Sequence, residues 1–487
     1  MTVSTELKAN MDKVKEIFAG CGDLVEGVLV PGPGISLGIV YIDNLVDRQT
    51  IDRQVIEPVM AAKYALADGN RAYEKVREAL RTLDVKDERN FDSAMDALLS
   101  GDTAVFVDGS EIIAVISSKG FQSRGVPEAS SEVTLMGSRE AFSEVMRTNT
   151  VLIRRRIRDT ALKVKQLKAG RRSKTDIAYV YIEDIARPEL VSQIEILINS
   201  LDIDALADIG VLEQLTEKSW QSPFPQAETT ERPDKAAASI LEGRAVIIAD
   251  NSPFALIVPA TLNTLCQSPD DYYQRFWIVA LTRILRYGAG IIAVILPGFY
   301  IAAAVYHPTL LPSALMLRMA EARQNVAFPA VAEVLIMDAA FELLREAGVR
   351  MPQAIGGTLG IVGGLIVGQA AVEAGIVSPI VVIVVALTAI CSFAIPNNSL
   401  VTGYRIIKFV VLILSACLGL LGFWAGILLI LIHLASLQSF GMPYLSPFVS
   451  GDTPCFSDLK DSFFRFPAKY MKKRPVFAKP GQSKRMG

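Results

Sequence analysis

The chain has 487 residues, 51% of them hydrophobic, and a net charge of −2. This near neutrality excludes a global electrostatic attraction to nucleic acid or to acidic surfaces. The cysteines are scattered and form no CxxC pair, which excludes a disulfide framework or a zinc site and is typical of a soluble part in a reducing compartment. The five are Cys21, Cys266, Cys391, Cys417 and Cys455.

Composition divides the chain into three stretches. Residues 1–286 have the ordinary charge of a soluble α/β protein, residues 287–437 are dominated by long apolar runs, and residues 438–487 are polar and basic. The first 18 residues are charged and amphipathic without the apolar core of a signal peptide. We therefore expect a large cytoplasmic region, a helical membrane domain of five or six transmembrane helices at 287–437, and a basic cytosolic tail at 438–487.

The soluble region predicts two α/β subdomains, at 1–130 and 131–286. In the first, helical spacing covers 5–19, 49–63 and 70–83, and strand-like runs cover 36–43, 103–108 and 111–117, the last two joined by a turn at Gly109-Ser110. In the second, we expect helices at 139–150, 151–167, 190–201 and 270–285. Strands are expected at 176–183, 245–250 and 254–259, the last two joined by a turn at 251–253.

Residues 154–175 carry the densest charge, with ten basic side chains against the single acidic Asp159. Nucleic acid or anionic lipid binding is one interpretation. A solvated helix face with an inter-domain or inter-subunit seam is the favoured one, since no aromatic residues are interleaved for base stacking. GRRSKT at 170–175 lacks the glycine that precedes the lysine of a phosphate loop, because Ser173 occupies that place.

No catalytic constellation is visible. The chain has two histidines, His307 and His433, both in or beside apolar runs, and it lacks GxSxG and HExxH motifs. We therefore expect no enzyme activity, no cofactor and no metal site.

The apolar region begins with a span at 287–306, kinked at Pro297-Gly298. The next helix, at 327–347, also carries Arg345 and Glu346, and three of its four carboxylates are singled out as candidates for function because charges are costly at membrane depth. These are Glu333, Asp338 and Glu342. This helix either spans with a polar face or lies at the interface. A span at 377–395 follows, and 409–437 is too long for one straight pass, which predicts a break near 422–426.

The most distinctive helix is expected at 355–376. Glycines recur every fourth residue on one face, which suits close helix packing in a bilayer. They are Gly356, Gly360, Gly364 and Gly368. A thin stripe on the other face is the candidate lining of a pore or a polar cavity, although a buried packing helix with internally bonded polar residues explains the pattern equally well. The stripe contains Thr358, Val362, Leu365, Gln369 and Glu373.

Basic residues orient the spans. With six passes, the inner segments are 345–351, the 397–408 loop with Arg405 and Lys408, and the tail, whereas the outer turn near 373–378 has no basic residue. The first outer loop, with Arg318 and Arg323, is the exception, and the rest of the pattern is consistent with both termini in the cytoplasm.

The chain resembles the A subunit of the GerA-type spore germinant receptors, in the broader family that includes the stage V sporulation protein AF. The resemblance covers nearly the whole length and depends on motifs in a fixed order. They are YID at 41–43, IRRRI at 153–157, GRRSKT at 170–175, PFP at 223–225, TERPD at 230–234, LEGR at 241–244, PFALIVP at 253–259, DYY at 271–273, ELLREAGVRMP at 342–352, GIVGGLIVGQAA at 360–371 and VVALTAI at 384–390.

The resemblance implies a subunit of the spore inner membrane that works with a transporter-like, nutrient-binding B subunit and a lipoprotein C subunit. It also implies a homo-oligomer that opens as a nutrient-gated cation channel, in which Val362 and Leu365 form an apolar constriction. An AF-type ion-conducting amplifier without its own nutrient subunit, and a non-conducting scaffold, are the alternatives.

Overall fold

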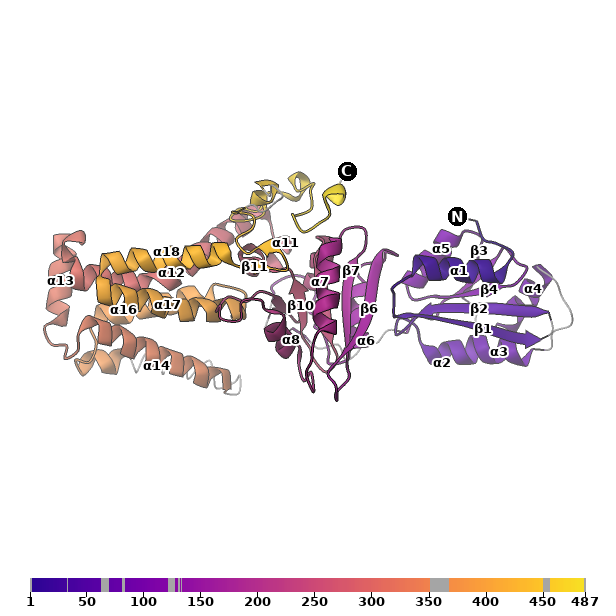
Figure 1. Cartoon of the computed structure of the whole chain (residues 1–487), viewed down its shortest axis with the longest axis horizontal. Helices are drawn as coiled ribbons and strands as arrows, with labels where there is room; N and C mark the ends of the chain where they lie inside the picture. The colour runs from indigo at the N-terminus through magenta and orange to yellow at the C-terminus, as the bar shows by residue number, and fades with distance from the viewer. Residues whose placement is uncertain are drawn as a thin grey trace.

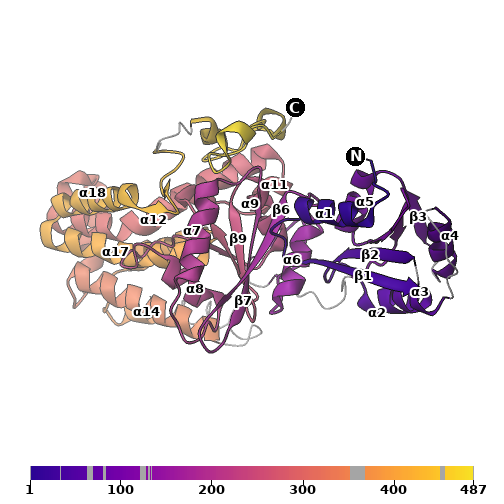
Figure 2. The same cartoon turned by 45° about the vertical axis from the view of Figure 1, so that its right-hand side comes forward.

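The computed structural model describes residues 2–32, 34–62, 70–80, 84–120, 128, 129, 132, 134–350, 368–449 and 456–485. Figure 1 shows three parts along the long axis: an N-terminal α/β unit, a second α/β unit and a group of helices. The C-terminal tail returns from the helices to lie over the second unit (Figures 1 and 2).

The first unit is a five-stranded antiparallel sheet of order β1-β2-β4-β5-β3 with helices on both faces. Its strands are β1 (Leu24–Gly32), β2 (Ile35–Ile42), β3 (Val85–Glu88), β4 (Thr103–Val107) and β5 (Ile113–Ile116). Its helices are α1 (Leu7–Ile17), α2 (Arg48–Ile51), which continues through a π turn into α3 (Glu57–Ala61), α4 (Asn70–Ala79) and α5 (Phe91–Leu99). Alternate residues of β2 and β4 face two separate cores, one under α1 and α5 and one under α2 to α4.

The second unit has the order β6-β7-β9-β10-β8, which repeats the strand order of the first. Its strands are β6 (Leu162–Ala169), β7 (Thr175–Ile182), β8 (Glu228–Thr230), β9 (Ala245–Ala249) and β10 (Ala255–Val258). Its helices are α6 (Met146–Arg154), α7 (Pro188–Asn199), α8 (Ile209–Thr216), α9 (Pro233–Leu241), α10 (Leu262–Leu265) and α11 (Asp270–Tyr273).

The repeat extends to the turns. Gly101 before β4 and Gly243 before β9 have φ of +94° and +95°, and each donates its amide hydrogen to a carbonyl three residues earlier at 3.0 Å. The left-handed region favours glycine, so both helix-to-strand turns require this residue. The sequence analysis did not detect the duplication.

Buried polar contacts join the two units. Arg154 at the end of α6 pairs with Asp23, with Nη2 2.9 Å from Oδ1 and both side chains buried. Lys163 on β6 donates to the carbonyl of Ile17 at 2.9 Å, and the amide of Gly22 donates to the carbonyl of Val164 at 2.9 Å. These two basic residues of the 154–175 cluster therefore belong to an inter-domain seam.

The expected helix at 151–167 is wrong. Helix α6 ends at Arg154, and β6 occupies Leu162–Ala169. The run LKVKQLKA alternates apolar and polar residues only over Leu162–Lys165, and as the edge strand of its sheet it pairs with β7 along its whole length. By contrast, the structure confirms the predicted β4–β5 and β9–β10 hairpins.

Six long helices of the third part are described: α12 (Phe276–Ile301), α13 (Ser313–Arg323), α14 (Ala330–Arg350), α16 (Pro379–Phe393), α17 (Asn398–Leu418) and α18 (Leu420–Ser436). A π turn, Ala302–Tyr306, continues α12. Among the described residues, Phe276–Tyr306 and Asn398–Leu418 are long and apolar enough to cross a membrane, and Pro379–Phe393 and Leu420–Ser436 are shorter apolar helices. The expectation of five or six spans therefore stays a prediction.

Three helix boundaries differ from the sequence-based expectation. Helix α12 begins at Phe276, so most of the expected 270–285 helix belongs to it. The expected loop at 397–408 is the start of α17, because the Asn397 side chain accepts from the amide of Leu400 at 2.9 Å and caps the helix. The break expected near 422–426 lies at Gly419, whose φ of +61° turns the chain between α17 and α18.

The tail packs on the second unit rather than extending freely. It contains a short hairpin of β11 (Gln438–Ser439) and β12 (Met442–Pro443) and three single turns of 3₁₀ helix. The amide of Lys479 donates to the carbonyl of Ile185 at 2.9 Å, and Ala478 forms a bridge with Ala186.

Candidate functional site in the helical part

Two ion pairs join α14 to α17. Lys408 Nζ lies 3.1 Å from Asp338 Oδ1, and these side chains are only 6% and 2% exposed. Arg405 Nε donates to Glu342 Oε1 at 2.9 Å. The two carboxylates are four residues apart on α14, so they lie on one face of that helix, and the two cations are three residues apart on one face of α17. The two faces meet with the helices antiparallel, so that each carboxylate is opposite a cation.

A small cavity of about 20 Å³ adjoins these pairs where four helices meet. Its wall includes Arg345 of α14, Thr388 and Ser392 of α16, and Tyr404 of α17. This volume is about that of one water-sized site. The polar wall is exceptional among helices that are otherwise apolar, and pairing offsets the large cost of burying its charges.

Glu333, at the start of α14, forms a second polar junction. Its side chain is fully buried, Oε2 accepts from the amide of Ser378 at 2.8 Å, and Oε1 lies 3.4 Å from Arg323 Nη2. The residue thus ties α13, α14 and the start of α16 together. The structure therefore places all three predicted carboxylates, Glu333, Asp338 and Glu342, against cations of other helices.

Most of the predicted glycine helix falls outside the described residues. Six of its singled-out positions cannot be placed there and stay predictions: Gly356, Thr358, Gly360, Val362, Gly364 and Leu365. At its described end, Gly368 is buried, and a Cβ added to it would lie 3.4 Å from Val382 of α16. Gln369 and Glu373 are exposed, and the Gln369 amide donates to Glu373 Oε1 at 3.2 Å.

The sequence analysis missed the partners of Asp338 and Glu342, because it assigned Arg405 and Lys408 to a loop. A usable signal is present in the sequence. RIIK at 405–408 and DAAFE at 338–342 both carry charges at the spacing of one helix turn, with opposite signs.

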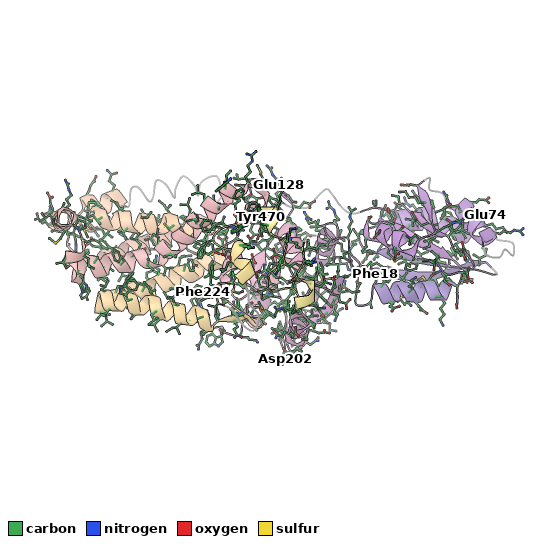
Figure 3. All side chains as sticks on the ribbon, turned by 90° about the horizontal axis from the view of Figure 1, so that it is seen from above. Phe18, Glu74, Glu128, Asp202, Phe224 and Tyr470 are labelled. Carbon is green, nitrogen blue, oxygen red and sulfur yellow. The ribbon has the colours of Figure 1, made fainter. Side chains whose placement is uncertain are left out.

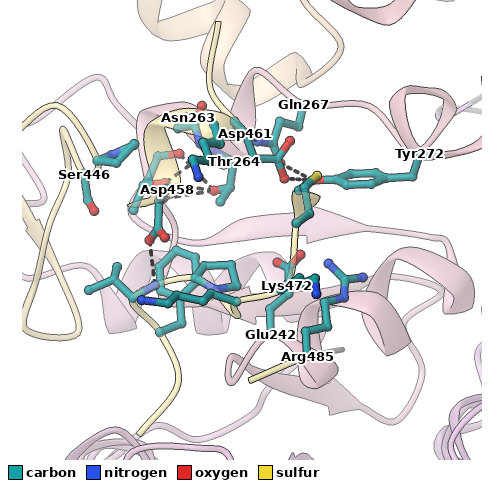
Figure 4. Close-up of a pocket in the computed structure, with 18 of the residues that line it drawn as sticks. Glu242, Asn263, Thr264, Gln267, Tyr272, Ser446, Asp458, Asp461, Lys472 and Arg485 are labelled. Atoms are coloured by element: carbon teal, nitrogen blue, oxygen red, sulfur yellow. Dashed lines mark hydrogen bonds between the residues drawn. The ribbon is translucent and has the colours of Figure 1, made fainter. Parts of the chain in front are cut away.

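A second polar cavity, of about 280 Å³, lies between the second α/β unit and the tail (Figure 4). Glu242 lies beside Lys472 and Arg485 in its wall, and the Tyr272 hydroxyl donates to Asp461 Oδ2 at 2.9 Å. Burial, together with the Asp461 carboxylate, raises the pKa of Glu242 to about 7. This carboxyl group therefore titrates near neutral pH.

Comparison with known proteins gives a consistent result. The family model for the Bacillus/Clostridium GerA spore germination protein matches residues 12–477. YfkQ, an uncharacterized membrane protein of Bacillus subtilis (strain 168), is 39% identical over 97% of this chain and 91% of its own length. Spore germination protein KA of the same organism is 38% identical over 97% of this chain and 87% of its own length.

Two further proteins are similar over shorter stretches. Stage V sporulation protein AF of Bacillus subtilis (strain 168) is 34% identical over 85% of this chain and 83% of its own length. The crystal structure of the N-terminal domain of the A subunit of the Bacillus megaterium spore germinant receptor GerK3 is 29% identical and covers 54% of this chain and 98% of that chain, with a TM-score of 0.43. From the family-model match over residues 12–477 and the 34–39% identity to the three Bacillus subtilis relatives, the chain belongs to the GerA family of spore germination proteins.

Proposed function

We propose that this protein is the A subunit of a nutrient-responsive germinant receptor that assembles into a ligand-gated cation channel in the spore inner membrane. In this proposal residues 1–130 and 131–286 form the cytoplasmic subdomains, 287–437 the membrane domain and 438–487 the cytosolic tail. A transporter-like B subunit binds the nutrient and a lipoprotein C subunit completes the receptor.

The observation that carries the proposal is the buried charge network between α14 and α17. Charged side chains inside apolar helices are costly and usually mark ion or proton pathways. Here, Asp338 and Glu342 are held against Lys408 and Arg405 beside a polar cavity. A structural role alone is served as well by apolar residues of similar volume, since buried ion pairs contribute little net stability.

The glycine helix supplies the second part of the proposal. Its glycine face forms the seam between copies of the chain, and its other face lines the pore, with Val362 and Leu365 as an apolar gate that closes by dewetting. We expect Val362→Ala to widen the constriction and to make spores leak cations or germinate without nutrient. An unchanged leak and dose response contradicts a gate at this position.

Recordings from purified full-length protein in planar bilayers test conduction directly. We expect unitary cation currents, and we expect Glu342→Gln to change conductance or selectivity, because it removes a charge from the wall of the cavity. Glu346→Gln is the matched control, since Glu346 lies on the same helix with its side chain 63% exposed and, among the residues that the structure describes, pairs with the exposed Arg350. The absence of currents from the wild type contradicts the channel and favours a scaffold.

An AF-type amplifier without its own nutrient subunit is the second candidate function, favoured by the 34% identity to stage V sporulation protein AF. The genes beside this one discriminate the two. Receptor B and C genes support the receptor, and a stage V sporulation operon supports the amplifier.

A further inference from the structure

A short loop of the second α/β unit, residues 222–226, inserts between the second turn of α17 and the last turn of α18. Figure 3 places Phe224 where the helices meet the second unit. The Phe224 side chain is buried, and its ring centroid lies 6.1 Å from that of Tyr404 in an edge-to-face arrangement and 6.0 Å from that of His433 in a stacked one. Aromatic pairs at such distances contribute specific geometry beyond the area that they bury.

The loop also contacts both helices closely, through the Ser222 side chain and the Pro223 carbonyl. Ser222 Oγ and His433 Nε2 of α18 lie 2.8 Å apart and share a hydrogen bond. At Gly403 of α17, an added Cβ would lie 2.6 Å from the carbonyl oxygen of Pro223. A side chain of any size therefore displaces the loop from the helix, and glycine is required for the contact.

The other end of the loop is anchored to the sheet of the second unit. The Gln226 side chain accepts from the amide of Ser219 at 3.3 Å and donates to its carbonyl at 3.1 Å. Strand β8 follows directly, and its buried Glu228 pairs with Lys235 at 2.9 Å and with Arg244 at 2.6 Å. Because these hydrogen bonds and ion pairs fix Gln226 and Glu228 within the second unit, the loop moves together with the sheet.

Beyond the loop, the same part of α17 carries the charge network. Tyr404 contacts Phe224 on one side and lines the 20 Å³ cavity on the other. Arg405 is the next residue, and Lys408 lies one turn further along the helix. Hydrogen bonds weaken steeply with distance and angle, so a small shift of this turn alters both ion pairs to α14.

We propose that Phe224 and its loop are the positioning contact through which the soluble α/β units set the register of α17, and thereby the Asp338–Lys408 and Glu342–Arg405 pairs. This inference rests on the proposed function, in which those pairs belong to the conducting part. In this proposal a conformational change in the soluble units reaches the membrane helices through the Phe224 loop. The chain segment that leads from α11 into α12 is not the main connection.

Amide hydrogen exchange of the full-length protein in detergent tests the connection without requiring conduction. Phe224→Ala removes the ring, and Gly403→Ala pushes the loop away. Gly288→Ala on α12 is the matched control, because an added Cβ there has no neighbour within 4 Å. We expect exchange at residues 338–342, which the loop does not touch, to become about tenfold faster in the two variants and to stay unchanged in the control.

Faster exchange confined to residues 222–226 and 398–404, with 338–342 unchanged, overturns the inference and leaves a local packing contact. Gly403→Ala and Phe224→Leu keep the test valid if Phe224→Ala does not fold. In bilayers, we expect Phe224→Ala to change the open probability while single-channel conductance stays within twofold of the wild type. An absence of wild-type currents contradicts the proposed function, whereas the exchange result decides separately whether the loop positions α17.

Discussion

Arg283 of α12 and Asp461 of the C-terminal tail are 178 positions apart in the chain, and Arg283 Nη1 donates to Asp461 Oδ1 at 2.7 Å. Arg283 is fully buried and also pairs with Asp271 at 2.9 Å. This arginine therefore fastens the tail and α11 to the base of the first long helix. The Tyr272 hydroxyl completes the junction by donating to the same tail carboxylate at 2.9 Å.

Removing the tail carboxylate loosens this junction. We expect Asp461→Asn to lower the free energy of unfolding by about 2 kcal/mol, because Arg283 keeps only one of its two carboxylates. Thermal unfolding in detergent and limited proteolysis of the tail measure the effect. Glu346→Gln, which removes an exposed pair, is expected to cost less than about 0.5 kcal/mol. Equal effects of the two substitutions contradict a clamp at Arg283.

The seam between the two α/β units depends on Asp23 and Arg154. Asp23→Ala leaves a buried arginine without its carboxylate, so we expect a loss of about 3–5 kcal/mol in urea unfolding followed by circular dichroism. The double variant Asp23→Ala with Arg154→Met recovers most of that loss. Glu26→Gln, which affects a partly exposed pair with Lys15, is the control. A double variant as unstable as the single one contradicts an electrostatic cause.

The Asp338–Lys408 pair is expected to show strong coupling in a double-mutant cycle. Lys408→Met alone leaves Asp338 unpaired among apolar helices, and we expect a loss of about 3–5 kcal/mol of stability. Asp338→Leu with Lys408→Met removes both charges and is expected to be nearly neutral. Thermal unfolding midpoints in detergent are measured for the wild type, the two single variants and the double variant. Additive effects show that the two side chains do not interact.

Glu242 predicts a pH dependence of stability. Its pKa is raised from 4.5 to about 7, so the folded protein keeps a proton that the unfolded chain loses between these values. The free energy of unfolding is therefore highest below about pH 4.5 and falls as pH rises through about 7, by as much as about 3 kcal/mol.

Glu242→Gln has no proton to lose and should remove this decline. Thermal unfolding between pH 5 and pH 8 measures it, with Glu189→Gln, at an exposed position of α7, as the control. A decline of the same size in Glu242→Gln assigns the pH dependence to other groups.

Local patterns predicted much of the soluble fold. The β4–β5 and β9–β10 hairpins followed from short apolar runs joined by turn residues, and the β7 run was equally clear. Strand β1 was not predicted, because Gly27 and Pro31 weaken its own signal and pairing with β2 decides its conformation. Strand β6 was taken for a helix because its lysines also fit a solvated helix face.

The sequence by itself determined where the chain becomes apolar, which helix carries buried carboxylates and to which family the chain is similar. Only the tertiary structure decided what those carboxylates meet, since their partners lie 63 and 70 positions away along the chain. It also decided that Arg154 joins two repeated units and that Phe224 reaches α17. The physical reason is that helix and strand periodicity is a local property, whereas a buried charge is stable only beside a partner that folding brings from elsewhere.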